Sequence, residues 1–266
     1  MTAFPPDQLA RLQEQTFLQR VDFHPELGST NDLALQMSLE PHLETPLLVL
    51  AERQTAGRGR GANRWWSNGG ALTFSLVIEP QLLDLPQDRW PRIALVAGLA
   101  LCDLLQDLLP DADCGIKWPN DVWLNRRKVA GLLVEIPPAS YPVPQRIVVG
   151  MGVNVNNSWQ AAPDEIAAKG IALCDVAGKE FPLTLVLADW LQHFARSLDQ
   201  LATQPEDLVA RWKERCVLTG KQVEIQQGNT LVRGCCRGID NEGALLVEGS
   251  NGVQRLFGGI VSAIGD

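Results

Sequence analysis

The order of strands and helices along the chain is the feature that most constrains its fold. Up to about residue 216, strand-like and helix-like apolar segments follow one another irregularly, whereas a doubly wound parallel fold requires strict alternation. The expected strands cover residues 46–52 and 72–78 and the segments "CGIKWP" and "RIVVGMGVNVN", and the expected helices cover about residues 30–39, 88–108, 183–203 and 205–215. This order predicts an α+β fold with a mixed sheet.

Beyond residue 216 the pattern changes to short strands separated by regular turns. The segments "KQVEIQ", "TLVRGCCRGI", "ALLVEG", "VQRLFG" and "IVSAIG" are punctuated by "QQGN", "DNEG" and "SNG". Turn signals at roughly 8–12 residue spacing are typical of a small antiparallel barrel. The chain is therefore expected to divide into a domain of residues 1–216 and a small β-barrel of residues 217–266.

Charge and apolar patterning exclude several classes of protein. A net charge of -8 argues against nucleic-acid binding through a broad basic face. The longest aliphatic stretch, residues 93–105, is interrupted by Asp103 and is shorter than the roughly 20 residues of a membrane-spanning helix. The sequence does not open with a basic segment followed by an apolar one, so no secretory signal is expected.

The cysteines and histidines predict neither a disulfide framework nor a metal centre. The six cysteines are scattered through a chain that is long enough to build a core without cross-links. Cys235 and Cys236 are neighbours on an expected strand, so their side chains point to opposite faces. None of the three histidines lies near another histidine or a cysteine in the sequence, so no metal-ligand set is visible. A reducing, cytoplasmic location is expected.

The stretch "QTAGRGRGANRWWSNGG", residues 54–70, joins two expected strands and is typical of a binding loop. Its glycines allow close backbone approach, and its arginines can hold a phosphate or carboxylate bidentately. A solvated surface loop or an RNA-binding Arg-Gly segment is the alternative. The pair Trp65 and Trp66 favours a ligand, because two large aromatic side chains are costly to leave in water.

Two further segments add polar groups to this loop. "KWPND", residues 117–121, contributes Lys117 at the end of a strand, although Trp118 could belong to the core and Asn120 could begin the hairpin predicted in "VWLNRRKVAGLLVEI". In "VGMGVNVN", Asn154 offers a donor and an acceptor that suit a ribose or purine edge. Neither a dinucleotide fingerprint nor a Walker-type phosphate loop is present, so any ATP site is unconventional.

Several motifs in order resemble those of biotin-protein ligases, also called biotin-[acetyl-CoA-carboxylase] ligases. They are "STN", "AERQTAGRGR", "RWWSNGG", "KWPNDVWLNRRKVAGLLVE", "VVGMGVNVN" and "RGIDNEGALLVE", and they extend from about residue 28 to the C-terminus. The resemblance implies a catalytic core like that of class II aminoacyl-tRNA synthetases, followed by a Src-homology-like barrel. It also implies ATP with Mg²⁺, a biotinyl-5′-adenylate intermediate, no prosthetic group, and transfer to one lysine of a biotin carboxyl carrier protein.

The resemblance assigns roles to individual residues. Lys117, Arg58 and Arg60 are implied as the catalytic cations. The residues implied to bind biotin are Ser29, Thr30, Asn31, Gln54, Gly57, Arg58, Arg60, Lys117, Val122, Gly131 and Gly150. The residues implied to bind ATP are Arg58, Arg60, Arg64, Trp65, Trp66, Lys117, Asn120 and Asn154. Of these, Ser29, Thr30 and Gln54 are expected at the ureido end of biotin, and Trp65 and Asn154 at the adenine.

The chain departs from the family pattern at a few positions. Asn63 stands where members often have arginine, Asn68 stands where they often have proline, and no basic residue follows Val261. These departures predict a loop that closes less tightly and a weaker affinity for ATP. Fewer than 30 residues precede Ser29, so a ligase without the N-terminal DNA-binding domain of some members is expected.

Other functions remain open at this point. A lipoate or octanoate ligase or transferase shares the core architecture, a silent module could bind biotin or a nucleotide without turnover, and an RNA-binding protein is disfavoured by the acidic charge. The expected state of assembly is a monomer or a homodimer, with neither nucleic acid nor membrane as a partner.

Overall fold

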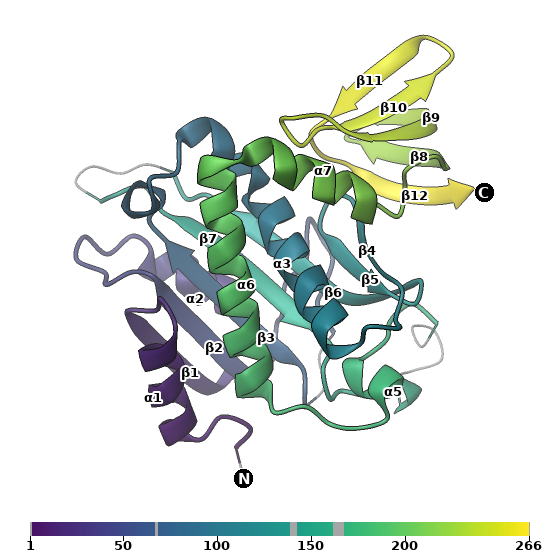
Figure 1. The fold of residues 1–266 in the computed structure, drawn as a ribbon. Coiled ribbons are helices and arrows are strands. Elements are labelled where there is room, and N and C mark those ends of the chain that lie inside the picture. The colour runs from purple at the N-terminus through teal and green to yellow at the C-terminus, as the bar shows by residue number, and fades with distance from the viewer. Residues whose placement is uncertain (1, 67–68, 139–142, 162–167, 266) are drawn as a thin grey trace.

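A seven-stranded mixed sheet is the frame of the larger part of the molecule (Figure 1). The computed structural model describes residues 2–66, 69–138, 143–161 and 168–265. The strands lie in the order β1-β2-β3-β7-β6-β5-β4; β1 and β2 run parallel, and the other neighbours run antiparallel. Their bounds are β1 (Arg20–Leu27), β2 (Leu47–Gln54), β3 (Leu72–Ile78), β4 (Cys114–Lys117), β5 (Asp121–Leu124), β6 (Arg127–Glu135) and β7 (Ile147–Val153).

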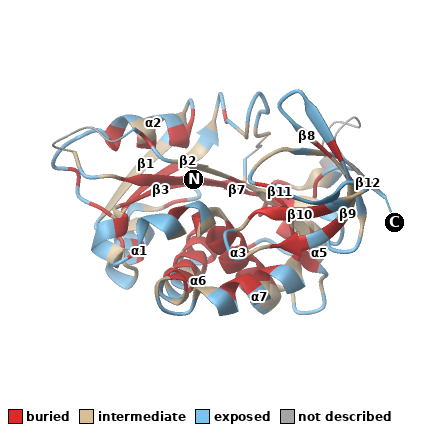
Figure 2. Cartoon of the chain, turned by 90° about the horizontal axis from the view of Figure 1, so that it is seen from above, coloured by how far each residue is buried: buried red, intermediate tan, exposed pale blue. Residues whose placement is uncertain are grey.

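Helices cover both faces of this sheet. Figure 2 shows α2 on one face and α1, α3, α6 and α7 on the opposite face. The helices are α1 (Pro6–Gln15), α2 (Thr30–Met37), α3 (Ile93–Leu108), α5 (Leu173–Ala177), α6 (Leu183–Thr203) and α7 (Pro205–Arg215), with 3-10 turns at η1 (Pro80–Leu83), η2 (Gln87–Arg92) and η3 (Trp159–Ala161). None of the described helices is both long enough and apolar enough to span a membrane.

The residues of β2 explain why the sheet is covered on both sides. Leu48 and Leu50 point into the larger core, which also includes α3 and α6, whereas Leu47 and Val49 pack with Met37 beneath α2. An unbroken apolar run is typical of a strand that is buried on both faces. The alternation of side chains therefore places Leu48 and Leu50 in one core and Leu47 and Val49 in the other.

Most of the predicted elements are confirmed, and the differences have physical causes. The helix predicted from residue 88 begins as an α-helix only at Ile93, because Pro91 lacks the N–H that an α-helical hydrogen bond needs. Helix α1 and strand β1 were not predicted. The sequence of β1, "RVDFHPEL", alternates polar and apolar residues, but Pro25 within the run weakens a strand prediction, and the strand is defined by its pairing with β2.

The C-terminal part is a five-stranded antiparallel sheet in the order β11-β10-β9-β8-β12. The strands are β8 (Gln222–Gln227), β9 (Thr230–Ile239), β10 (Leu245–Gly249), β11 (Gly252–Leu256) and β12 (Ile260–Gly265). Within the described residues β11 and β12 are its two edges, so the closed barrel remains a prediction. The boundary between residues 216 and 217 also remains a prediction.

The predicted hairpin is formed by β5 and β6, and its turn makes one residue a target for stabilisation. Asn125 and Arg126 have φ values of 48° and 63°. Asparagine tolerates this left-handed conformation, whereas arginine pays a steric cost that glycine avoids. We expect Arg126→Gly to raise the free energy of unfolding by about 0.5–1 kcal/mol, measured by urea denaturation. The same change at Arg127, which lies in β6, should lower it instead; equal effects would contradict this explanation.

Candidate active site

A cavity of about 840 Å³ lies on the face of the sheet that carries α2. Gly150 and Gly152 of β7 lie on this face with Val148, which packs beneath α2. The N-terminus of α2 and the loop of residues 57–65 form further walls. The C-terminal sheet closes one side through residues 226–228 and 258–261, so both parts of the chain enclose the cavity.

One end of the cavity is polar and uncharged. Ser29 caps the N-terminus of α2, and the next residue, Thr30, donates from its backbone N and its Oγ1 to Gln54 Oε1, at 2.7 and 3.2 Å. Ser75 Oγ lies 2.7 Å from Asn31 Oδ1 and 2.9 Å from Thr30 Oγ1. Ser29, Thr30 and Asn31 are each only 4% exposed. Fixed donors and acceptors without charge suit a neutral polar group such as an amide or urea.

The other end of the cavity is cationic. Among the described residues that line the cavity, five are basic and one, Asp121, is acidic; of the five, Arg58 is paired with Asp32 and Glu135 and lies apart from this end. Lys128 Nζ lies 2.6 Å from Asp121 Oδ1, and Lys117 Nζ lies 5.0 Å from the centre of the Trp123 ring. This excess of positive charge in a partly enclosed space suits an anionic group.

The surroundings of Lys117 predict a pH dependence of anion binding. Burial lowers the pKa of its ammonium group from 10.5; Asp121 opposes this shift and Lys128 adds to it. Lysine binds an anion in its protonated form, which is lost as pH rises through its pKa. We therefore expect the affinity for an anionic ligand to fall at a lower pH than it would with a lysine of ordinary pKa. In that pH range, binding of the anion should take up protons. Calorimetry across alkaline pH would measure both effects, and Lys117→Arg should remove them.

The loop of residues 57–65 folds back on itself as a small hairpin. Gly59 N donates to Asn63 O at 2.8 Å, and Trp65 N donates to Gly57 O at 3.0 Å. Gly61 has a φ of +66°, which suits glycine at the tip. Asn63 closes the turn, because its Nδ2 donates to Arg60 O at 3.0 Å. The residue that departs from the family pattern thus stabilises the loop locally, whereas Asn68 lies outside the described residues.

Trp65 lies against strand residues that have no side chain. A Cβ atom on Gly152 would lie 2.3 Å from Trp65 Cε2, and one on Gly131 would lie 3.3 Å from Trp65 Cζ3. Gly131 and Gly152 are register partners on β6 and β7. The ring also lies beneath Lys128, with 5.8 Å between Nζ and the ring centre. The two glycines therefore make room for an aromatic ring on the floor of the cavity.

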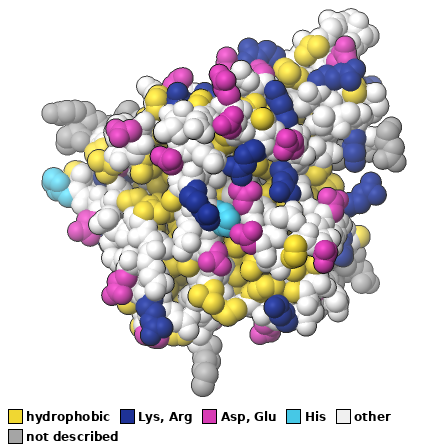
Figure 3. Space-filling model, in the orientation of Figure 1, with side chains coloured by type: hydrophobic (Ala, Val, Ile, Leu, Met, Phe, Trp, Pro, Cys, Tyr) yellow, Lys and Arg dark blue, Asp and Glu magenta, His cyan; other side chains and the backbone are white. Residues whose placement is uncertain are grey.

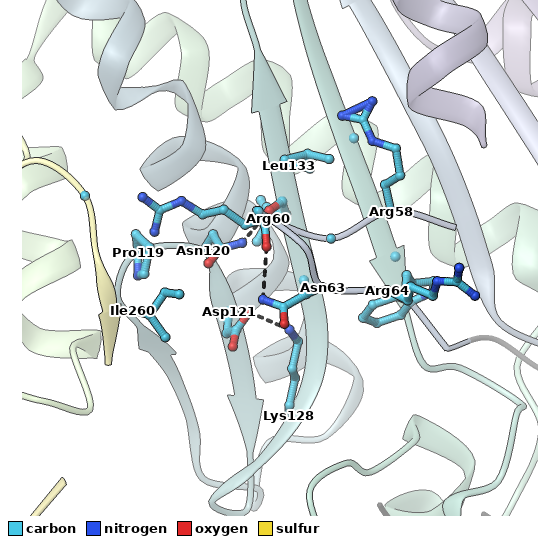
Figure 4. Close-up of a pocket in the computed structure, with 18 of the residues that line it drawn as sticks. Arg58, Arg60, Asn63, Arg64, Pro119, Asn120, Asp121, Lys128, Leu133 and Ile260 are labelled. Carbon is cyan, nitrogen blue, oxygen red and sulfur yellow. Dashed lines mark hydrogen bonds and ion pairs between the residues drawn. The ribbon is translucent and has the colours of Figure 1, made fainter. Parts of the chain in front are cut away.

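The side chains of Arg60 and Arg58 point in different directions from this loop. Arg60 Nη1 donates to Gly259 O at 2.6 Å, which joins the loop to the C-terminal sheet. Arg58 is paired with Asp32 and with Glu135, whose two carboxylate oxygens lie 2.7 and 2.8 Å from Arg58 Nη2. In Figure 4 its guanidinium group points away from Arg60 and Lys128. The charge of Arg58 is thus bound by two carboxylates, apart from the cationic end.

Models of two protein families match the chain. Residues 25–154 match the Biotin/lipoate A/B protein ligase family, and residues 218–262 match the Biotin protein ligase C terminal domain. A relative from Paracoccus denitrificans, a biotin–[acetyl-CoA-carboxylase] ligase, is 36% identical over 236 residues, covering 86% of this chain and 94% of the relative. The chain belongs to the biotin protein ligase family.

Two more comparisons agree with membership of the biotin protein ligase family. A biotin–[acetyl-CoA-carboxylase] ligase of Mycobacterium tuberculosis is 30% identical, covering 86% of this chain and 84% of the relative. The structure of a biotin protein ligase from Aquifex aeolicus in complex with biotin and ATP shares the fold, with a TM-score of 0.78 at 24% identity, over 92% of this chain and 98% of that one. The predicted family, and with it an enzyme of the ligase class, is confirmed.

The structure places most residues singled out by the biotin protein ligase motifs at the cavity. Those that line it are Ser29, Thr30, Asn31, Gln54, Arg58, Arg60, Arg64, Trp65, Lys117, Asn120, Gly131 and Gly150. Gly57 and Val122 are buried beside it; a Cβ on Gly57 would lie 3.1 Å from Trp65 O. Trp66 contacts Trp159 edge to face, with 5.1 Å between ring centres. Asn154 is 1% exposed, and its Nδ2 donates to Ile171 O at 3.1 Å.

Lys128 lines the cavity but was not singled out from the sequence. In the motif "NRRKVAGLL" it follows two arginines at the hairpin turn and therefore resembles a solvated residue. Alternation along β6 could not have found it, because residues three positions apart point to opposite faces of a regular strand. Lys128 precedes Gly131 by three positions across a register shift in the β5–β6 ladder, which returns its side chain to the cavity.

Proposed function

We propose that the chain joins biotin to a carrier protein in two steps. In the first step, a carboxylate oxygen of biotin attacks the α-phosphorus of ATP, which gives biotinyl-5′-adenylate and releases pyrophosphate. In the second step, a lysine amine of a biotin carboxyl carrier protein attacks the acyl carbon. AMP leaves with the bonding electron pair, and the amine nitrogen loses a proton to give the amide. No side-chain nucleophile is needed, because the acceptor lysine is itself the nucleophile once it is positioned.

The two-ended cavity is the observation that carries this proposal. Biotin has a neutral ureido ring at one end and a carboxylate at the other. The polar end around Thr30, Asn31 and Gln54 suits the ureido ring, and the end around Lys117 and Lys128 suits the carboxylate and the α-phosphate. Cations that are in place before charge develops stabilise the transition state of phosphoryl attack without reorganisation.

The remaining residues receive roles that follow from their positions. Arg60 and Arg64 are proposed to contact the phosphates, and Trp65 the adenine, with Asn120 nearby. Ser29 is proposed at the ureido ring, and Gly131 and Gly150 at the floor beneath the ligand. Val122, Gly57, Trp66 and Asn154 are proposed to support these groups from behind.

The alternative substrate, lipoate, fits the polar end less well. A dithiolane ring has no N–H or C=O group, so it would cover the buried hydroxyl and amide groups of Thr30 and Asn31 without bonding to them. Sites that bond a polar ligand discriminate strongly against an analogue that lacks the polar groups. The proposal therefore favours biotin over lipoate or octanoate.

Mg²⁺ is proposed to enter with ATP. The described residues contain no group of three or more His, Cys, Asp or Glu side chains that could hold a metal ion by themselves. Mg²⁺ commonly keeps several waters and binds one or two carboxylates together with substrate phosphates, and Asp121 is a carboxylate that lines the cavity. Bound there, the ion would neutralise phosphate charge as pyrophosphate leaves.

The proposal extends to partners and location. A biotin carboxyl carrier protein is proposed as the macromolecular substrate, the cytoplasm as the compartment, and a monomer or homodimer as the state of assembly. Nucleic acid is not proposed as a partner: the net charge is -8, and Figure 3 shows basic and acidic side chains interspersed on the helix-covered face. The catalytic domain is proposed to comprise residues 1–216 and the C-terminal domain residues 217–266.

Mass spectrometry of reaction mixtures tests this function directly. The purified protein is incubated with Mg²⁺, ATP and either biotin or lipoate, with and without a biotin carboxyl carrier domain. Biotinyl-adenylate, followed by a biotin adduct on one carrier lysine, is the expected result. Lipoyl-adenylate alone would favour the alternative, and binding without any adenylate would contradict catalysis.

A further inference from the structure

A chain of hydrogen bonds links the loop over the cavity to the buried polar end. Its central group is Glu135, the last residue of β6. On one side Glu135 accepts from Arg58 of the loop. On the other side Glu135 Oε2 accepts from Asn31 Nδ2 at 2.7 Å. Asn31 in turn is 2.7 Å from Ser75 Oγ. A single carboxylate therefore contacts both the loop and the floor of the polar end.

The position of Asn31 leaves it little freedom to move. Its Nδ2 also donates to Leu133 O at 3.2 Å, so both amide hydrogens are used. Its Oδ1 lies so close to Gly150 that a Cβ atom there would be 1.9 Å away. The direction of the remaining lone pair on Asn31 Oδ1 is thus set by Glu135, Leu133 and Ser75 together.

The two carboxylates that pair with Arg58 differ in how strongly they hold its side chain. Asp32 is 53% exposed and contacts one nitrogen of Arg58, as an ordinary surface ion pair does. Such exposed pairs contribute little. Glu135 is 30% exposed and also accepts from the buried Asn31 amide, so its loss would remove charge-assisted hydrogen bonds to two partners rather than one. Glu135 of β6 therefore contributes more than Asp32 to holding the loop in place.

We propose that Glu135 is a positioning residue that ties closure of the loop, through Arg58, to the orientation of Asn31 at the polar end of the cavity. The inference rests on the proposed function, since biotin is the ligand whose ureido ring would lie at this end. Glu135 touches no reacting atom. It retains the ligand in two ways: it keeps the loop of residues 57–65 over the cavity through Arg58, and it fixes the orientation of Asn31 Oδ1, which would accept a hydrogen bond from the ligand. Arg58 consequently acts on retention of biotin rather than on the phosphate.

The test is the rate at which bound biotin dissociates, followed by stopped-flow tryptophan fluorescence. Glu135→Gln and Arg58→Ala are each expected to speed dissociation by about tenfold, while KM for ATP stays within about twofold. Because both changes break the same bond, the double variant should fall well short of the product of the single effects. Trypsin should also cut the loop of residues 57–65 faster in Glu135→Gln.

Matched controls separate this role from a general loss of structure. Glu248→Gln removes a similar arginine–glutamate bond in the C-terminal sheet, between Arg237 and Glu248, and should leave dissociation unchanged. Asp32→Asn should have a smaller effect than Glu135→Gln. If Glu135→Gln fails to fold, Arg58→Lys replaces it: lysine keeps the charge but lacks the planar fork that reaches two carboxylates, so dissociation should again quicken.

The outcomes distinguish this inference from the proposed function. If the wild-type protein binds biotin and forms the adenylate, but Glu135→Gln releases biotin at the wild-type rate, the inference is wrong and the function stands. Multiplicative effects in the double variant would also overturn it, because Glu135 would then act independently of Arg58. If the wild-type protein neither binds nor activates biotin, the function falls and the inference falls with it.

Discussion

Replacing either Lys117 or Lys128 with alanine is expected to slow formation of biotinyl-adenylate by about 100- to 1,000-fold, the usual cost of losing one preorganised charge. Both ammonium groups lie at the cationic end of the cavity, where negative charge gathers as the carboxylate attacks the α-phosphate. Lys117 is partly desolvated, and Lys128 is oriented by Asp121, so neither has to reorganise during the reaction. Single-turnover measurement of adenylate by mass spectrometry gives the rate.

Two comparisons make this prediction specific. Lys213→Ala, at an exposed position on α7, should retain the wild-type rate. Arg58→Ala should retain most of the adenylation rate at saturating biotin, because its charge is bound by Asp32 and Glu135. A near-normal rate in both lysine variants would show that the phosphate lies elsewhere. A loss in Arg58→Ala as large as in the lysine variants would restore the direct catalytic role that the family motif implies.

Replacing either of two glycines in β7 with alanine is expected to weaken the binding of one substrate, and a different substrate in each variant. In Gly150→Ala the new Cβ would clash with Asn31 Oδ1, at 1.9 Å, and Asn31 is held by three neighbours. In Gly152→Ala it would meet the Trp65 ring at 2.3 Å. We expect KM to rise by about tenfold or more for biotin in the first variant and for ATP in the second, because each substrate loses interactions that a shifted partner no longer makes. Steady-state kinetics with each substrate varied in turn measures the KM for biotin and the KM for ATP in each variant.

The two glycine variants serve as controls for each other, and Gly98→Ala serves both. Gly98 lies in α3, and a Cβ there would meet Ile116 Cδ1 at 3.5 Å, an ordinary van der Waals distance. This variant should keep both KM values and fold at least as stably as the wild type, since alanine favours a helix over glycine. The assignment of the two ends fails if both β7 variants raise the same KM.

The elements predicted from the sequence are those defined by residues close together in the chain. The strand at β3, the hairpin at β5 and β6 and the short C-terminal strands follow from alternation and turn residues, and they form as expected. Strand β1 was not predicted although its residues alternate, because Pro25 interrupts the run and its partner β2 is paired in parallel after a long connection. Closure of the C-terminal strands into a barrel depends on pairing between distant edges, which no local pattern fixes.

The same distinction applies to the site. Motifs marked the loop, Lys117 and the polar residues at the start of α2, because unusual residue types gather there. They could not show that Arg58 is paired with Glu135, which is 77 residues away, or that a register shift brings Lys128 into the cavity. They also did not reveal why Asn63 is tolerated, since its bond to Arg60 O depends on the folded turn. Side-chain direction and ion pairing are properties of the assembled sheet.

The wall that the C-terminal sheet gives to the cavity has a consequence for genetic analysis of this protein. Arg60 reaches a carbonyl oxygen that is 199 residues further along the chain, at Gly259, and a Cβ on Gly258 would lie 2.7 Å from Arg60 Nη2. Substitutions at Gly259, where φ is +154° and a Cβ would lie 2.6 Å from Ile225 Cγ2, are therefore expected among alleles that impair substrate use, although this position lies in the last ten residues of the chain. A mutant library confined to the first half of the chain would omit the cavity residues at 226–228 and 258–261.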